Sequence, residues 1–350
     1  MAGETANIAE VANKISKDIF KWFRWEKLPT MDDNFPCHKV DSHKKKKTKT
    51  DNPSYTHPVD TVFRYFDPYL NKYIYLNTDL KSYAKKSINP AQTKKAIESL
   101  ARTIDCASSS VDWKKKYILD TSPYSIRALL FIYNWDKEYD ADLMGELQKL
   151  KLSDIPLTED SIIHIIDPQR ITYLYSVVKD IESLIANQDI SKDEYSFLYP
   201  DLLLHKAHGD QSKYPATIEA LCSPYMIMKH NPVYEFQEVN GAPKKVLVND
   251  SGYVIYYNET GATYEEFLYL FDVLSRLQIL SSDNLIKLRV ASPKVDTNIR
   301  SNFERAKSTY IADWGLDGYR EKDLERIEFD IVPTTASNYS PGMLAWRIDD

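Results

Sequence analysis

Two strand-like runs joined by a short turn are the feature that most limits how this chain can fold. Residues 59–67 and 72–81 alternate apolar and polar side chains, which is typical of β-strands with one buried face. The connection between them, DPYLN, contains Pro68 and Asn71, which both favour turns. The sequence therefore predicts an antiparallel hairpin.

The register of this hairpin is expected to bring two carboxylates together. The position of the turn predicts that Asp60 lies opposite Asp79 or diagonal to it. Lys81 leaves the same face as Asp79, because successive side chains of a strand alternate between faces. Opposed carboxylates repel each other unless a cation lies between them, so the pattern indicates a metal site.

The residue types indicate which metal this site would prefer. Two carboxylates, a backbone carbonyl and waters form the usual environment of Mg²⁺ or Mn²⁺ beside a phosphate group. We expect Asp60 to bridge the metal, Asp79 to ligate it, and Lys81 to stabilise charge that develops on the phosphate. The alternative interpretation is a charged strand end on a solvated edge.

The same residues resemble a known motif. HPVD at 57–60 followed by TDLK at 78–81 looks like the signature of the PD-(D/E)XK nuclease superfamily, which includes many restriction and repair nucleases. The predicted helix before the motif, and the helix and strand after it, are similar to the core of that superfamily over roughly residues 5–135. Two details depart from the usual motif. The proline is not adjacent to Asp60, and the acidic residue before Lys81 is Asp rather than Glu.

This resemblance implies a fold and an activity. The fold is a restriction-endonuclease-like αβββαβ core, and the activity is Mg²⁺-dependent (or Mn²⁺-dependent) hydrolysis of DNA phosphodiester bonds by an endonuclease. Restriction-type relatives imply a bacterial protein that acts in antiviral defence against foreign DNA. The alternative is a non-catalytic subunit that keeps the nuclease fold as a DNA-binding or assembly module. RNA as the substrate also stays open.

The resemblance also implies supporting residues near the metal. Many such nucleases add a Glu from the first helix, and Glu10 is the candidate metal ligand here, although it lies away from the apolar stripe of the predicted helix 7–24. Gln92 matches a glutamine that some members use, but a helix-start residue is the simpler interpretation. His57 and Tyr83 flank the motif and are expected either to touch substrate or to pack.

Charge divides the chain into two parts. Residues 1–120 hold 22 Lys and Arg against 15 Asp and Glu, whereas the remainder holds 23 against 36. Predicted helices and strands mix in both parts, so we expect an α/β chain. Its domains would be a nuclease domain at 1–150 and an acidic α/β domain at 151–350 that binds a partner or a second copy. No internal repeat is visible in the sequence.

Lysine-rich segments of the basic part are expected to contact DNA phosphates without reading base sequence. They are Lys44–Lys49, Lys85–Lys86, Lys94–Lys95 and Lys114–Lys116. The last segment overlaps a second D-x-K triplet, Asp112 to Lys114, which has no strand pattern and is interpreted as surface. No helix-turn-helix or zinc finger is visible, so a partner subunit or a homo-oligomer is expected to supply specificity.

Other chemistries and compartments are excluded by pattern. The chain has no phosphate-binding GxxxxGK[ST] or GxGxxG loop. HKAH at 205–208 offers two histidines but no third ligand at a usual spacing, so zinc is not expected. Cys37, Cys106 and Cys222 form no CxxC pair, which favours a reducing compartment. The longest apolar stretch, ALLFIY, is too short to span a bilayer, so a cytoplasmic protein without membrane association is expected.

Overall fold

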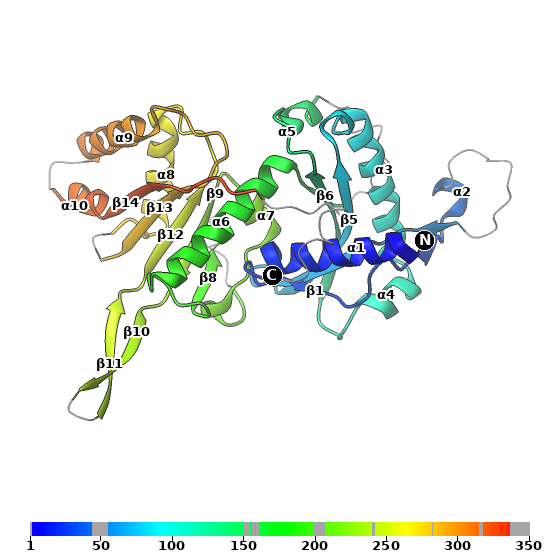
Figure 1. Ribbon diagram of the computed structural model, residues 1–350, viewed down its shortest axis with the longest axis horizontal. Coiled ribbons are helices and arrows are strands. Elements are labelled where there is room, and N and C mark those ends of the chain that lie inside the picture. The colour runs from blue at the N-terminus through cyan, green and yellow to red at the C-terminus, as the bar shows by residue number, and fades with distance from the viewer. Residues whose placement is uncertain are drawn as a thin grey trace. The chain divides into compact units, whose positions relative to one another are not determined.

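The computed structural model describes residues 2–43, 55–149, 155, 158, 161–198, 207–239, 242–281, 283–314 and 318–336. Within these ranges the chain forms two compact units, whose elements are labelled in Figure 1. The first unit runs to Ile171 except for residues 68–70, and the second comprises those three residues and 172–336. None of the helices in the described ranges combines the length and apolar character needed to cross a membrane.

The first unit is built on a five-stranded sheet with the order β1-β4-β5-β6-β7. Strand β4 is antiparallel to both β1 and β5, while β6 runs parallel to β5 and to β7. The strands are β1 (Glu26–Lys27), β4 (Thr61–Asp67), β5 (Lys72–Tyr83), β6 (Tyr124–Asn134) and β7 (Ile163–Ile166). The predicted hairpin is thus confirmed as β4 and β5.

Helices cover both faces of this sheet. Helix α3 (Pro90–Ala107) begins at Asn89, whose side chain caps it, and its apolar stripe packs on alternate residues of β6. Helix α1 (Ala2–Ile15) continues into a π-helical turn (Ser16–Phe20), and Phe20 contacts Phe63 and Phe131 on the opposite face. The inner residues of β6 are consequently buried on both faces, as is typical of a strand with parallel neighbours.

Short elements surround the hairpin. Strands β2 (Phe35–Pro36) and β3 (Thr56–His57) form a small antiparallel pair, with α2 (Val40–His43) between them in sequence. Helix α4 (Val111–Tyr117) follows α3 and buries Trp113, whose Nε1 donates a hydrogen bond to Asn77 of β5 (3.1 Å). The lysine-rich segment that the sequence predicts to be surface is therefore a helix, and the buried Trp113 anchors one of its faces.

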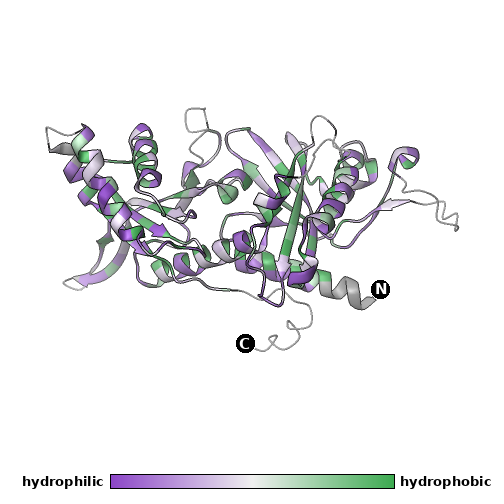
Figure 2. Cartoon of the chain, turned by 90° about the horizontal axis from the view of Figure 1, so that it is seen from above, coloured by the Kyte–Doolittle hydropathy of each residue, from purple (hydrophilic) through white to green (hydrophobic). Residues whose placement is uncertain are grey.

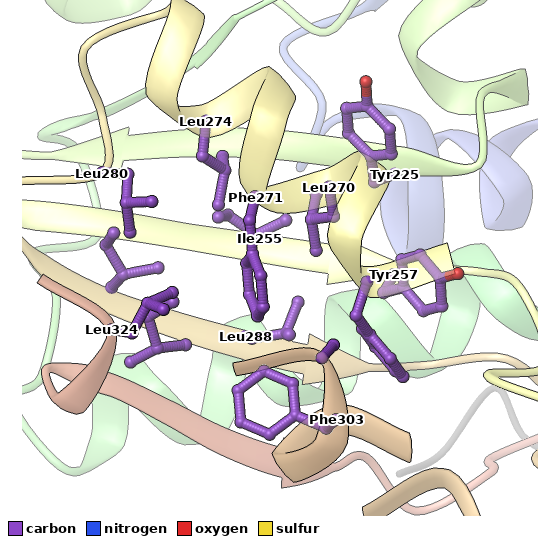
Figure 3. Close-up of a cluster of buried hydrophobic side chains, with 14 of the residues drawn as sticks. Tyr225, Ile255, Tyr257, Leu270, Phe271, Leu274, Leu280, Leu288, Phe303 and Leu324 are labelled. Carbon is purple, nitrogen blue, oxygen red and sulfur yellow. The ribbon is translucent and has the colours of Figure 1, made fainter. Parts of the chain in front are cut away.

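The second unit contains another five-stranded sheet, with the order β14-β13-β12-β9-β8. Helices α8 (Tyr264–Arg276) and α9 (Ile299–Trp314) bury aromatic and aliphatic side chains against it (Figure 3). Helix α6 (Pro168–Ala186) contacts β12, where Tyr173 donates a hydrogen bond to the Tyr256 carbonyl (3.2 Å). The strands are β8 (Tyr195–Leu198), β9 (Tyr225–His230), β12 (Gly252–Tyr257), β13 (Leu285–Val290) and β14 (Ile327–Ile331).

The remaining elements lie outside the two sheets. They are η2 (Lys85–Ser87), α5 (Leu143–Leu147), η5 (Gln211–Lys213), α7 (Ile218–Cys222), α10 (Tyr319–Glu325) and the hairpin of β10 (Val233–Val239) with β11 (Ala242–Asn249). Figure 2 shows hydrophobic residues along the strands of the sheets and on one side of the larger helices, as expected for layered α/β units.

The two units share one topology. In each, a helix leads into three antiparallel strands, a helix follows, and two strands are then added in parallel. This order holds for β1, β4, β5, β6 and β7 in the first unit and for β8, β9, β12, β13 and β14 in the second. The insertions differ, because β2–α2–β3 interrupts the first unit and β10–β11 the second. The shared fold is invisible as a sequence repeat, since a fold requires matching hydrophobic patterns rather than matching residues.

The division between the units differs from the expected one at residue 150. Strand β7 follows that position and pairs with β6, so it belongs to the first sheet. The chain passes into the second unit within α6, between Ile171 and Thr172. An α/β chain with an αβββαβ core at its N-terminus is confirmed, and the second unit contains the same element order.

Candidate functional site

The end of the β4–β5 hairpin carries the predicted acidic residues. Thr61 pairs with Thr78 in the antiparallel register, and one step further places Asp60 opposite Asp79. Asp60 directly precedes β4, and its carbonyl accepts a hydrogen bond from the Asp32 amide (2.9 Å). The register expected from the turn position is confirmed.

Hydrogen bonds fix the Asp60 carboxyl against β5. Its Oδ2 accepts a hydrogen bond from the backbone amide of Leu80 at 2.7 Å. Burial raises the pKa of Asp60 to about 7, and the negative charge of Asp79 adds to the shift. The Asp60 carboxyl therefore holds its proton more tightly than an ordinary aspartate does.

Lys81 completes a compact charged group. Its Nζ lies 2.5 Å from Asp79 Oδ1, and the two side chains are 31% and 16% exposed. Burial alone would lower the pKa of Lys81, but the carboxylates of Asp79 and Asp60 outweigh it and raise the pKa. The lysine is thus held as a cation beside the carboxylate pair.

This arrangement fits a divalent cation. Asp60 and Asp79 offer carboxylate oxygens from facing positions of the hairpin, and oxygen donors are those that Mg²⁺ and Mn²⁺ prefer. A cation bound there would favour the ionised form of Asp60. The donor set therefore agrees with the metal that the motif implies.

The other candidate residues lie in different settings. Glu10 is exposed on α1, and its charge is not among the main contributions to the pKa shift of Asp60. Gln92 is exposed in the first turn of α3, where its backbone amide donates to Asn89. Tyr83 lies beyond Lys81 on β5, and burial raises its pKa. His57 is fully buried, with its ring beside that of His43.

The second D-x-K triplet has no comparable geometry. Asp112 is exposed in the first turn of α4, which is a helix rather than a strand. Its surface position agrees with the interpretation from the sequence.

The lysine-rich segments are only partly available to a ligand. Lys44–Lys49 lies outside the described residues. Lys85 forms an ion pair with Asp140 (3.0 Å), and Lys116 forms one with Asp33 (2.7 Å). Lys95 of α3 and Lys115 of α4 are exposed.

The second unit does not carry the counterparts of Asp60, Asp79 and Lys81 at the matching positions of its strands. Tyr225 pairs with Tyr257 where β9 begins, and the next step is a hydrogen bond from the Asn258 amide to the Pro224 carbonyl (2.7 Å). When β9 is matched to β4 by the residue at which each strand begins, Pro224 corresponds to Asp60, Asn258 to Asp79 and Thr260 to Lys81. The carboxylate pair and the lysine are all replaced.

A second group of metal-ligand side chains was missed in the sequence. Cys37, His43, His57 and Cys106 come together in the first unit, with all four side chains buried. The first histidine of HKAH, His205, lies outside the described residues. The four residues follow no local spacing that signals a metal site, and only the fold brings them together.

Comparison with known proteins agrees with the geometry of the hairpin. Residues 1–170 match the family model described as the GAPS4 protein PD-(D/E)XK nuclease domain. No curated protein and no solved structure matched the chain. The match covers the whole first sheet and the motif-bearing hairpin. Residues 1–170 therefore belong to the PD-(D/E)XK nuclease superfamily.

Proposed function

We propose that the chain is a Mg²⁺-dependent (or Mn²⁺-dependent) DNA endonuclease whose active site is Asp60, Asp79 and Lys81. The observation that carries this proposal is the placement of the two aspartates opposite each other at the end of the β4–β5 hairpin, with the Lys81 ammonium 2.5 Å from Asp79. Facing carboxylates are unfavourable in a purely structural role, because like charges repel each other. The family match supports the same chemistry.

Each residue has a distinct task in this mechanism. Asp60 and Asp79 hold the cation, and the Leu80 amide keeps the Asp60 carboxylate oriented (2.7 Å). A bound divalent cation supplies polarisation of a phosphodiester oxygen and a lowered pKa of an attacking water. Lys81 is placed to stabilise negative charge that grows on the phosphate in the transition state. Hydrolysis adds water across the P–O bond and leaves a phosphate monoester and a hydroxyl.

Glu10 remains a further proposed ligand. It lies in α1, the helix that precedes the sheet, and its exposed carboxylate is available to a cation or to water. Its contribution is proposed as secondary to that of the aspartates.

DNA and a protein partner are the proposed binding partners. Exposed Lys95 and Lys115 can contact phosphates, which would give affinity without sequence specificity. The second unit has the nuclease topology without the catalytic residues, which supports a non-catalytic role in binding a partner subunit or a second copy. Exposed Tyr234 and Phe236 on β10 also support such a role. We place this activity in cytoplasmic antiviral defence, in keeping with the family.

The decisive experiment is cleavage of supercoiled plasmid by the purified full-length chain with and without Mg²⁺. Wild type is expected to nick the plasmid only with the metal, and Asp79→Ala is expected to be inactive. Asp112→Ala, which alters the exposed copy of the triplet, is the matched control and should cut like wild type. A chain that cuts RNA but not DNA would contradict the proposal that DNA is the substrate. A folded chain that cuts neither nucleic acid, alone or with proteins that copurify from its host, would favour the non-catalytic alternative.

A further inference from the structure

Four ligand-type side chains converge beside the hairpin, at a place that the proposed nuclease chemistry does not use. Cys37 follows β2, His43 ends α2, His57 lies on β3, and Cys106 lies in the last turn of α3. One potential ligand atom from each residue lies within 4.8 Å of those of the other three. The exposed fraction of these residues ranges from 0% to 8%, so the cluster is closed to solvent.

The spacing of the ligand atoms is that of a tetrahedral metal site. Zinc bonds of about 2.3 Å to sulfur and about 2.0–2.1 Å to nitrogen give tetrahedron edges of about 3.8 Å (S–S), about 3.6 Å (S–N) and about 3.4 Å (N–N). The Sγ atoms of Cys37 and Cys106 are 3.7 Å apart. His43 Nδ1 lies 3.5 Å and 3.3 Å from these two sulfurs and 3.4 Å from His57 Nε2.

A metal site accounts for the cluster better than a disulfide or a hydrogen-bonded polar core does. A disulfide has sulfurs about 2.05 Å apart, and Cys37 and Cys106 are free thiols at nearly twice that distance. A hydrogen-bonded core would need strong donors, whereas thiols donate weakly. Without a bound ion, four polar groups would therefore be buried with too few strong hydrogen bonds to offset the loss of their hydration.

The residues around the cluster are arranged as the outer shell of a metal site. Asp105 Oδ2 accepts from His43 Nε2 (3.1 Å), which leaves Nδ1 as the free ligand atom, and Lys39 binds the other Asp105 oxygen (2.7 Å). The contact between Asp105 and His43 thus selects the histidine tautomer that a metal site requires.

We propose that Cys37, His43, His57 and Cys106 bind one Zn²⁺ ion as a closed structural site. Two thiolates and two neutral imidazoles leave the bound ion without net charge, as its apolar surroundings require. Binding releases the two thiol protons to solvent, and no oxidation or reduction takes place. With four protein ligands and no solvent-exposed position, this zinc does not carry out catalysis.

The zinc site would connect the β2–β3 insertion to α3 and to the catalytic hairpin. His57 lies three residues before Asp60, and Val59 between them packs in the apolar cluster that contains Cys37 and Cys106. Zinc therefore holds the segment that positions the Asp60 carboxylate, without touching the Mg²⁺ site itself.

Metal analysis of the intact chain, purified without chelators, tests this site. Wild type is expected to contain one zinc per chain by plasma mass spectrometry, and the Cys37→Ser/Cys106→Ser double variant none. Cys222→Ser, which changes the half-exposed cysteine of the second unit, is the control and should keep its zinc. Cobalt(II) exchanged into wild type should give the thiolate charge-transfer bands of a tetrahedral site, which an oxygen-only magnesium site cannot produce.

A milder variant covers the case in which the double variant does not fold. Asp105→Asn keeps all four ligands and loses only the carboxylate on His43, so chelator competition should show zinc affinity about 10–100-fold weaker. Asp79→Ala should retain full zinc content, which separates this site from the proposed nuclease. Folded, zinc-free wild type whose affinity for added zinc is unchanged in Asp105→Asn would overturn the proposal, as would zinc retained by the double variant.

Discussion

Asp60 lies opposite Asp79 across the end of the β4–β5 hairpin, where its carboxyl accepts a hydrogen bond from the Leu80 amide (2.7 Å). Burial raises the pKa of Asp60 to about 7, and the negative charge of Asp79 adds to the shift. Lys81 adds one positive charge to this group, 2.5 Å from Asp79. We propose that a divalent cation binds at this pair and stabilises the fold.

Magnesium is expected to raise the melting temperature of the wild-type chain. A ligand that binds only the folded state at tenfold its Kd stabilises that state by about 1.4 kcal/mol. Asp79→Ala should abolish this response, because it removes a ligand that Asp60 alone cannot replace. Differential scanning fluorimetry with a Mg²⁺ titration measures both. A variant that still responds like wild type would show that the metal binds elsewhere.

The melting temperature of the Glu10→Gln variant should be measured in the same Mg²⁺ titration. If Glu10 is a secondary ligand, the response should weaken without disappearing, since the two aspartates remain. An unchanged response would remove Glu10 from the metal site. Asp112→Ala again serves as the control, because its carboxylate is equally exposed on a helix of the same unit.

Lys81→Ala is expected to separate cleavage from binding. The ammonium acts on charge that develops in the transition state, so cleavage should fall on the order of 10²–10³-fold. DNA affinity, measured by fluorescence anisotropy in Ca²⁺, should stay within a few-fold of wild type. Asp112→Ala changes the exposed carboxylate of the second triplet and should leave cleavage unchanged. Normal cleavage by Lys81→Ala would make Lys81 a structural residue only.

The pH dependence of stability should report the Asp60 carboxyl directly. Its folded pKa of about 7 lies above that of an unfolded aspartate, so the folded state keeps a proton that the unfolded state loses. The stabilisation that the folded state gains from this proton is complete below about pH 4 and is lost as pH rises through about 7.

Asp60→Asn should therefore match wild type near pH 4 and exceed it above pH 7 when Mg²⁺ is absent. The expected difference is on the order of 2 kcal/mol, which is less than the full pKa shift implies, because solvent screens part of the interaction. Urea denaturation across this pH range is the measurement. If the free energies of unfolding of the two proteins changed with pH in parallel, Asp60 would titrate normally.

Local patterns predicted the parts of the fold that depend on neighbours in sequence. The hairpin register followed from Pro68 and Asn71 at the turn, and strand β6 from its apolar run. Helix α4 was missed because its lysines suggested a solvated segment, whereas the burial of Trp113 against Asn77 is a tertiary contact. The hydrophobic pattern records which residues are buried, but not what they are buried against.

The cysteine and histidine cluster shows the same limit more strongly. Cys37 and Cys106 are 69 positions apart and meet only because α3 packs beside the β2–β3 insertion. Zinc motifs are recognisable in sequence when ligands come in close pairs, and this set has none. The shared topology of the two units was hidden for a related reason, since their residues differ at all three matched site positions.

The full-length chain is expected to assemble in solution. The proposed partner-binding role of the second unit predicts either a homo-oligomer or a stable complex with a copurifying protein. Multi-angle light scattering of the chain, alone and as purified from its native host, tests both. A monodisperse species of 40.6 kDa with full nuclease activity and no companion would contradict this role.

The second unit is expected to contribute no chemistry to cleavage. Asn258 occupies the position of Asp79 and Thr260 that of Lys81, and a carboxylate pair cannot form because Pro224 replaces Asp60. Asn258→Ala and Thr260→Ala should therefore cut plasmid DNA within about twofold of wild type, since an effect on catalysis requires a group that acts in the transition state. Circular dichroism should confirm that both variants fold. Loss of cleavage in folded Asn258→Ala, comparable with that in Asp79→Ala, would instead mean that both copies of the fold take part in catalysis.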